Sequence, residues 1–277
     1  MVVGVDGSPH SDAAVSWAAA YASLTHRPLL IVSVIGELAL GEMLFDPTEA
    51  RHLRRIFARR VGDAALVMAR RSAPQLPMAT LTPNGDPREA LIDLSAQAAM
   101  VVVGTRGHGP VTSLILGSVS VAVSAHAQSP VAIVRPREQP GAGIVVGVSG
   151  DGSDEAAVQF AADLASAQAA SLDAVHAWRI EGMLLDGVTH TERLEIRTRH
   201  DRMLKKALCG LDEKYPDVRL QSHLAEGGPV EALVHWSRTA DVVVVGSRGR
   251  SSTVGLIGSV SRAVAEHAHS TVVVVRD

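Results

Sequence analysis

The stretch VVVGTRG, at residues 101–107, is separated by nine residues from Gly117-Ser118. A run of valines indicates a buried strand, and the glycines after it let backbone amides approach a ligand with no Cβ in the way. The serine at the start of the following helical segment can cap the helix or give its hydroxyl to a phosphate, and the free N–H groups and positive dipole end of the helix favour an anion there. The stretch predicts a strand, a loop and a helix that cradle a phosphate, although a plain tight turn is the alternative interpretation.

A second copy of the stretch favours the cradle over the plain turn. VVVGSRG, at residues 243–249, is separated by only eight residues from Gly258-Ser259. The opening residues MVVGV and IVVGV match at an offset of 143, residues 85–107 match 227–249 at 142, and the offset after the loop is 141. A period of about 140 residues is the size of a domain rather than of a solenoid repeat. We expect two copies of one domain, at 1–137 and 143–277, joined by a linker rich in proline and glycine.

Each half alternates apolar runs with helical patterns. Apolar runs without strict alternation indicate strands that are buried on both faces, and intervening helices indicate parallel strands. The sequence therefore predicts an α/β fold with a doubly wound parallel sheet, whose ligands bind at the carboxyl ends of the strands. In the first half, we expect strands at 2–5, 29–34, 78–81, 100–103 and 131–134, and helices at 12–23, 48–71, 88–98 and 118–127.

Composition limits the classes of function. The chain has 277 residues, of which 47% are hydrophobic, which is enough for two cores. A net charge of −3 and an aromatic content of 3% disfavour nucleic acid as a partner. Cys209 is the only cysteine, so neither an intrachain disulfide nor a cysteine-rich zinc site is expected. Because the sequence has no long apolar run and no export signal, we expect a cytoplasmic protein that does not enter a membrane.

Three motifs of the chain together resemble those of a known protein family. The chain is similar to tandem universal stress proteins, and in particular to their ATP-binding branch. An opening strand that ends in Asp-x-Ser, here residues 6–8, and a closing SPVAIV, here residues 129–134, are typical of that family. The spacing Gly-x2-Gly-x9-Gly-Ser/Thr, which marks the ATP-binding branch, is matched by Gly104, Gly107, Gly117 and Ser118.

The resemblance implies a fold and an assembly. Each half is expected to be a Rossmann-like domain of the HUP type with a five-stranded parallel sheet. The closing strands, at residues 131–134 and 271–275, are expected to pair the two halves and so to cover an apolar sheet edge. Homodimerisation of the whole chain is a further expectation. The resemblance does not identify any other protein partner.

The resemblance also implies a binding site for ATP. Val5, Asp6, Val34 and Val103 are expected to surround the nucleoside. Magnesium is expected to arrive with the triphosphate, so no metal site made of protein ligands is predicted. The phosphates are expected to lie on the glycine loop and the helix after it, at Gly104, Arg106, Gly107, Gly117, Ser118, Val119 and Ser120.

The second half departs from the pattern in two places. Ser149 stands where Asp6 stands in the first half, and the loop is one residue shorter. Asp151 and Gly255 are candidates to compensate. We nevertheless expect this half to bind ATP more weakly or not at all, at the matching residues Gly246, Gly249, Gly258 and Ser259.

Three functions are compatible with this pattern. The first is an ATP-binding regulator of a stress or signalling response, with little or no hydrolysis. The second is a slow ATPase or nucleotidyl-transfer enzyme, for which His108 is the only loop residue that suits a general base. The third is a structural or interaction module that binds no nucleotide. The sequence favours the first function and predicts no catalytic residue.

Overall fold

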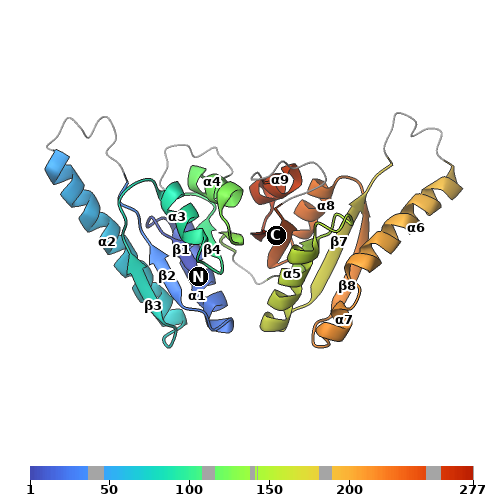
Figure 1. Cartoon of the computed structure of the whole chain (residues 1–277), viewed down its shortest axis with the longest axis horizontal. Helices are drawn as coiled ribbons and strands as arrows, with labels where there is room; N and C mark the ends of the chain where they lie inside the picture. The colour runs from blue at the N-terminus through green and yellow to red at the C-terminus, as the bar shows by residue number, and fades with distance from the viewer. Residues whose placement is uncertain are drawn as a thin grey trace. The chain divides into compact units, whose positions relative to one another are not determined.

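The chain divides into two compact units, Met1–Pro136 and Arg137–Asp277, which are described separately here. In Figure 1 the first unit runs from blue to green and the second from yellow-green to red. The computed structural model describes residues 1–36, 47–107, 116–137, 141, 143–180, 189–247 and 257–276.

The first unit is a parallel five-stranded sheet with the order β3-β2-β1-β4-β5. Its strand order reverses between β1 and β4, which is where doubly wound sheets place their ligands. The strands are β1 (Val2–Gly4), β2 (Leu29–Val32), β3 (Met78–Leu81), β4 (Val101–Gly104) and β5 (Val131–Val134).

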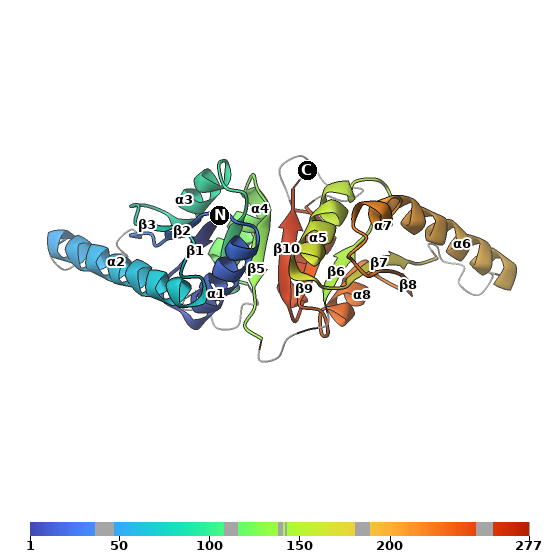
Figure 2. The same cartoon turned by 90° about the horizontal axis from the view of Figure 1, so that it is seen from below.

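Four helices cover this sheet. They are α1 (Pro9–Leu24), α2 (Pro47–Ser72), α3 (Pro87–Ser95) and α4 (Ser118–His126). Helix α1 packs against α2, and α3 packs against α4, so that each pair covers one face of the sheet (Figure 2). The predicted order of strands and helices is confirmed, with β1 and β2 ending one and two residues earlier than expected.

Burial explains why β1, β4 and β5 read as continuous apolar runs. The valines of these strands are 0–4% exposed, because helices cover both faces of the sheet. Strand β3 lies at the edge, and three of its four residues are exposed. Helix α1 begins where it does because Ser8 Oγ accepts the N–H of Ser11 at 3.2 Å and Pro9 occupies the first turn.

The second unit repeats the same topology, with the order β8-β7-β6-β9-β10. Its long helix ends early, since Gly210 adopts a φ of 78° and a short helix follows. The strands are β6 (Ile144–Gly147), β7 (Leu172–Trp178), β8 (Leu220–Glu226), β9 (Val242–Gly246) and β10 (Thr271–Val275). The helices are α5 (Glu155–Gln168), α6 (His190–Ala207), α7 (Leu211–Lys214), α8 (Pro229–Trp236) and α9 (Ser259–His267).

Within the described ranges, every helix is too short or too polar to cross a membrane. Those ranges also contain no group of three or more His, Cys, Asp or Glu side chains placed to hold a metal ion.

Candidate functional site

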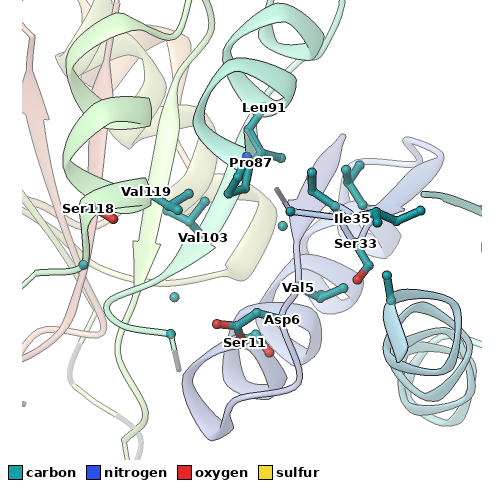
Figure 3. Close-up of a pocket in the computed structure, with 18 of the residues that line it drawn as sticks. Val5, Asp6, Ser11, Ser33, Ile35, Pro87, Leu91, Val103, Ser118 and Val119 are labelled. Carbon is teal, nitrogen blue, oxygen red and sulfur yellow. The ribbon is translucent and has the colours of Figure 1, made fainter. Parts of the chain in front are cut away.

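The first unit has a cavity of about 630 Å³ at the carboxyl ends of β1, β2 and β4 (Figure 3). This volume lies within the range typical of sites for small molecules. The cavity is therefore at the place that the reversal of strand order predicts, and it is large enough for a ligand of nucleotide size.

All eleven site residues expected in the first half line this cavity. They come from the ends of three strands and from the first turn of α4, which the parallel topology brings to one edge of the sheet. The residues are Val5, Asp6, Val34, Val103, Gly104, Arg106, Gly107, Gly117, Ser118, Val119 and Ser120.

Asp6 and Gly107 lie against each other at the floor of the cavity. The N–H of Ser8 donates to Asp6 Oδ1 at 3.0 Å, which fixes the carboxylate in the turn before α1. A Cβ added to Gly107 would collide with the Asp6 carboxylate. Position 107 therefore requires glycine because of this close approach to the carboxylate.

Gly104 has a different structural role from the one expected. A Cβ at this position would lie 2.7 Å from the carbonyl oxygen of His10, so glycine allows the end of β4 to pack on the start of α1. Thr105 Oγ1 and His10 Nδ1 lie 3.1 Å apart beside this contact. Gly104 lines the cavity, but its lack of a side chain serves the packing of strand against helix.

The start of α4 is fixed onto the end of β4 by two hydrogen bonds. The N–H of Gly117 donates to the carbonyl of Thr105 at 2.7 Å, and Ser120 Oγ donates to the carbonyl of Gly104 at 2.6 Å. Gly117 is the N-cap and no side chain makes a capping bond, so Ser118 does not cap α4, which was one of its two expected roles. Ser118 is the exposed first residue of the helix, at its positive end.

The opposite side of the cavity is mainly apolar, although Arg54 of α2 also lines it and donates to the carbonyl of Gly36 at 3.0 Å. Val5 and Val103 are buried in the sheet, and α2 contributes Leu53, Phe57 and Ala58. Leu53 is 59% exposed and Phe57 is 60% exposed, so these two side chains form an apolar rim. The sequence pattern predicted a helix here but missed these three residues, because tertiary packing decides which face of α2 meets the site.

The loop side of the cavity carries positive charge. Arg106 is exposed and lines the cavity. Burial, together with the nearby charge of Arg106, lowers the pKa of Arg135 to about 10. An anion bound beside Arg106 would offset this repulsion, because it would place negative charge next to both guanidinium groups.

In the second unit, the described ends of the loop between β9 and α9 make the same hydrogen bonds as those of the loop between β4 and α4. The N–H of Gly258 donates to the carbonyl of Ser247 at 2.8 Å, and Ser261 Oγ donates to the carbonyl of Gly246 at 2.5 Å. Ser259 begins α9 just as Ser118 begins α4. The missing residue therefore leaves both described ends of the loop unchanged; Gly249, Gly255 and His108 lie outside the described residues.

Asp151 does not occupy the place of Asp6. Its Oδ1 accepts the hydroxyls of Ser149 and Ser153, each at 2.6 Å. Asp154, which is only 6% exposed, accepts the N–H groups of Ser149 and Gly150 at 2.8 and 2.9 Å. In the loop after β6, the carboxylates thus accept hydrogen bonds from other residues of the same loop. The single exchange of Asp6 for Ser149 did not predict this difference.

The fold and cavity define a tandem α/β protein with a cavity at the carboxyl edge of the sheet of its first unit. The model of the universal stress protein family matches residues 1–135 and 143–276, so the chain belongs to the universal stress protein family. A universal stress protein of Mycobacterium tuberculosis is 34% identical over 299 residues, covering 100% of this chain and 94% of that protein. A second one from the same organism is 32% identical over 296 residues, covering 100% and 96%.

A solved structure supports the same fold. The crystal structure of a universal stress protein from Archaeoglobus fulgidus matches with a TM-score of 0.73 and 19% identity, covering 99% of this chain and 95% of that one. The expected recognition of the family and of its tandem α/β fold is confirmed.

Proposed function

We propose that this universal stress protein binds ATP in its first unit and acts as a nucleotide-dependent regulator of a stress or signalling response. The observation that carries the proposal is the convergence of an apolar chamber, one carboxylate and a glycine-edged helix start on a single cavity of about 630 Å³. An apolar base, a ribose with hydroxyl donors and an anionic phosphate chain require these three environments in this order.

Each part of ATP has a matching part of the cavity. The adenine fits between Val5, Val34 and Val103, where apolar surface is available. The Asp6 carboxylate accepts hydrogen bonds from the ribose hydroxyls. The phosphates lie at the first turn of α4, where backbone N–H groups and the charge of Arg106 stabilise them. Magnesium arrives with the nucleotide and is held mainly by its phosphates.

Hydrolysis is not part of the proposed function. Among the described residues that line the cavity, Asp6 is the only carboxylate, and the N–H of Ser8 engages it. A slow ATPase is the second candidate, with His108 as its base. Phosphate release from ATP by the intact chain and by His108→Ala separates the two functions, since a regulator gives equal background rates in both proteins.

The proposal extends to the whole chain. Residues 1–137 form the domain with the ATP site, and residues 143–277 form a domain whose site is altered. ATP bound in the first domain contacts β1, α2 and α4 together, so occupancy biases the surface that these elements present to a protein partner. A cytoplasmic homodimer is the assembly that we propose.

Calorimetric titration of ATP and magnesium into the intact chain tests the site. Asp6→Ala should weaken ATP at least tenfold, or by about 1.4 kcal/mol, because the ribose loses its acceptor. Asp93→Ala is the matched control, because Asp93 is exposed on α3 away from the cavity. Equal affinities for both variants would contradict the assignment of Asp6, and no saturable heat with the wild type would contradict ATP binding.

A further inference from the structure

The second unit contains a counterpart of the nucleoside chamber, and its residues can be matched one by one. The N–H of Gly85 donates to the carbonyl of Ile35 at 3.1 Å, and the N–H of Gly227 donates to the carbonyl of Trp178 at 2.9 Å. Trp178 therefore takes the place of Ile35. Two residues earlier on the same strand path, His176 takes the place of Ser33.

The long helices match in the same way. Met78 begins β3 and Leu220 begins β8, and each pairs with the first residue of the neighbouring strand. The offset is 143 at Trp178 and 142 at Leu220; counted back from Leu220 at 142, His200 matches Ala58 in α2. Ser33 and Ala58 both line the first cavity, so two small residues of that chamber are histidines in the second unit.

The two histidines occupy the chamber together. His176 Nε2 and His200 Nδ1 lie 2.7 Å apart, and the ring centroids are separated by 5.0 Å. His176 is 3% exposed, and Trp178 is 4% exposed with its ring 5.9 Å from that of His200. Side chains of the protein therefore fill the space that is open between Ser33 and Ala58 in the first unit.

The hydrogen bonds of this pair are satisfied without a ligand. His176 Nδ1 lies 2.7 Å from the carbonyl of Val148, which only accepts, so His176 carries its proton on Nδ1. His176 Nε2 then accepts the Nδ1–H of His200. Because buried polar groups are costly only when they lack partners, this closed chain of bonds stabilises the filled state.

The filling extends to the turn after β6. A Cβ built on Gly150 would lie 3.2 Å from Met203 Cβ and 3.4 Å from His176 Cε1, so α6 and β7 press directly on this turn. Gly150 has a φ of 78°, and the matching Gly7 has a φ of 84°, so the two turns share a backbone shape. The difference between the units thus lies in the side chains that cover the turn.

We propose that His176 and His200 close the second unit to nucleosides, so that the intact chain holds one nucleotide. This inference rests on the proposed ATP site of the first unit. Because the described ends of the two loops have the same geometry, the pair of residues at 33 and 58, or at 176 and 200, determines whether a base has room in a unit. The second unit also lacks the ribose acceptor, since Ser149 stands in place of Asp6.

Equilibrium dialysis of the intact chain with radiolabelled ATP, and separately with radiolabelled adenosine, counts the sites. One equivalent of ATP per chain is expected. Adenosine needs no phosphate loop and so reports on the nucleoside chamber alone. Two equivalents of ATP with the wild-type chain would overturn the inference and leave the proposed function standing, whereas no bound ATP would contradict the proposed function itself.

Reciprocal exchanges test the histidines in both units. Ser33→His with Ala58→His should fill the first chamber and abolish ATP binding. The control is Ala20→His, which adds an imidazole to the exposed side of α1 and should bind one equivalent. The inference would be overturned if the doubly substituted first unit bound ATP like the control.

The opposite exchange should create a site. His176→Ser with His200→Ala reopens the second chamber, and Ser149→Asp in the same variant supplies the ribose acceptor, so adenosine at saturation should rise from one to two equivalents per chain. Circular dichroism identifies a variant that has not folded. In that case, the exchange in the first unit alone tests the role of the histidines. A folded variant that still bound one equivalent would overturn the role of the histidines.

Discussion

At the scale of single residues, the site depends on close contacts that allow very little extra volume. Gly107 lies against the Asp6 carboxylate, and Gly104 lies against the backbone of His10. Both glycines belong to the same motif, but glycine is needed at each position for a different structural reason. If a side chain were added at either position, the atoms that it displaced would take up space that the cavity needs for its ligand.

Gly107→Ala tests the first of these contacts. The added methyl group should displace the Asp6 carboxylate and weaken ATP binding at least tenfold, while thermal unfolding changes little because position 107 is exposed. Calorimetric titration with ATP measures the loss. Gly62→Ala in α2 is the matched control: its Cβ would meet only Ser33 and Thr80, at an ordinary contact distance of 3.9 Å, so ATP affinity should be retained and stability should rise by about 1 kcal/mol. Unchanged ATP affinity in Gly107→Ala would contradict the proposed contact.

The sequence predicted the motif residues because strand, glycine and helix start are local features. Asp6, Gly107 and Gly117 could be placed at one sheet edge from topology alone. Leu53 and Phe57 could not, since the orientation of α2 depends on long-range packing. The pairing of His176 with His200 was also missed, because 24 residues separate them and neither has a local motif.

At the scale of elements, capping explains where the long helix of the second unit begins. The Thr189 hydroxyl accepts the N–H of Glu192, and the Glu192 carboxylate accepts the N–H of Thr189 at 2.8 Å, which makes a capping box. The Thr189 N–H and hydroxyl each donate to the Glu192 carboxylate at 2.8 Å, and these two hydrogen bonds lower the pKa of Glu192. Helix α6 carries His200, so the cap also fixes the start of the helix that closes the second chamber.

Thr189→Ala should destabilise the chain by about 1 kcal/mol at pH 7, measured by urea denaturation. A carboxyl group whose pKa is lower in the folded state stabilises the fold above its unfolded value, and this contribution is lost as the pH falls through the folded pKa. The difference between wild type and variant should therefore shrink as the pH falls below the ordinary pKa of a glutamate and through the lowered pKa of Glu192. Thr198→Ala, on an exposed site of the same helix, is the control and should show no such dependence on pH. A pH-independent difference for Thr189→Ala would contradict the role of Glu192.

The elements themselves were largely predictable from apolar runs and helical periodicity. The break between α6 and α7 was not, because it depends on the left-handed conformation of Gly210 in a helical sequence. The loops after β4 and β9 differ in length by one residue, yet their described ends match, since Ser120 and Ser261 make the same bond to the strand.

At the scale of the whole molecule, duplication has produced two units of one topology with different chambers. The first is open at Ser33 and Ala58, and the second is filled by histidines. The proposed stoichiometry of one nucleotide per chain rests on this difference. Pairing of the closing strands between the two halves stays a prediction from the family resemblance.

The proposed homodimer gives a direct prediction of mass. Size-exclusion chromatography with light scattering should give twice the chain mass of 29.0 kDa. The mass should hold across a tenfold dilution, because a regulator that signals through a stable dimer must stay associated at low concentration. A mass of one chain throughout would contradict the proposed assembly.

The crystal structure of the intact chain with ATP and magnesium tests the central claim most directly. The account predicts adenine between Val5, Val34 and Val103 and phosphates at the first turn of α4, with the space between His176 and His200 closed. An empty first cavity at saturating ATP, or a nucleotide bound only in the second unit, would contradict the account.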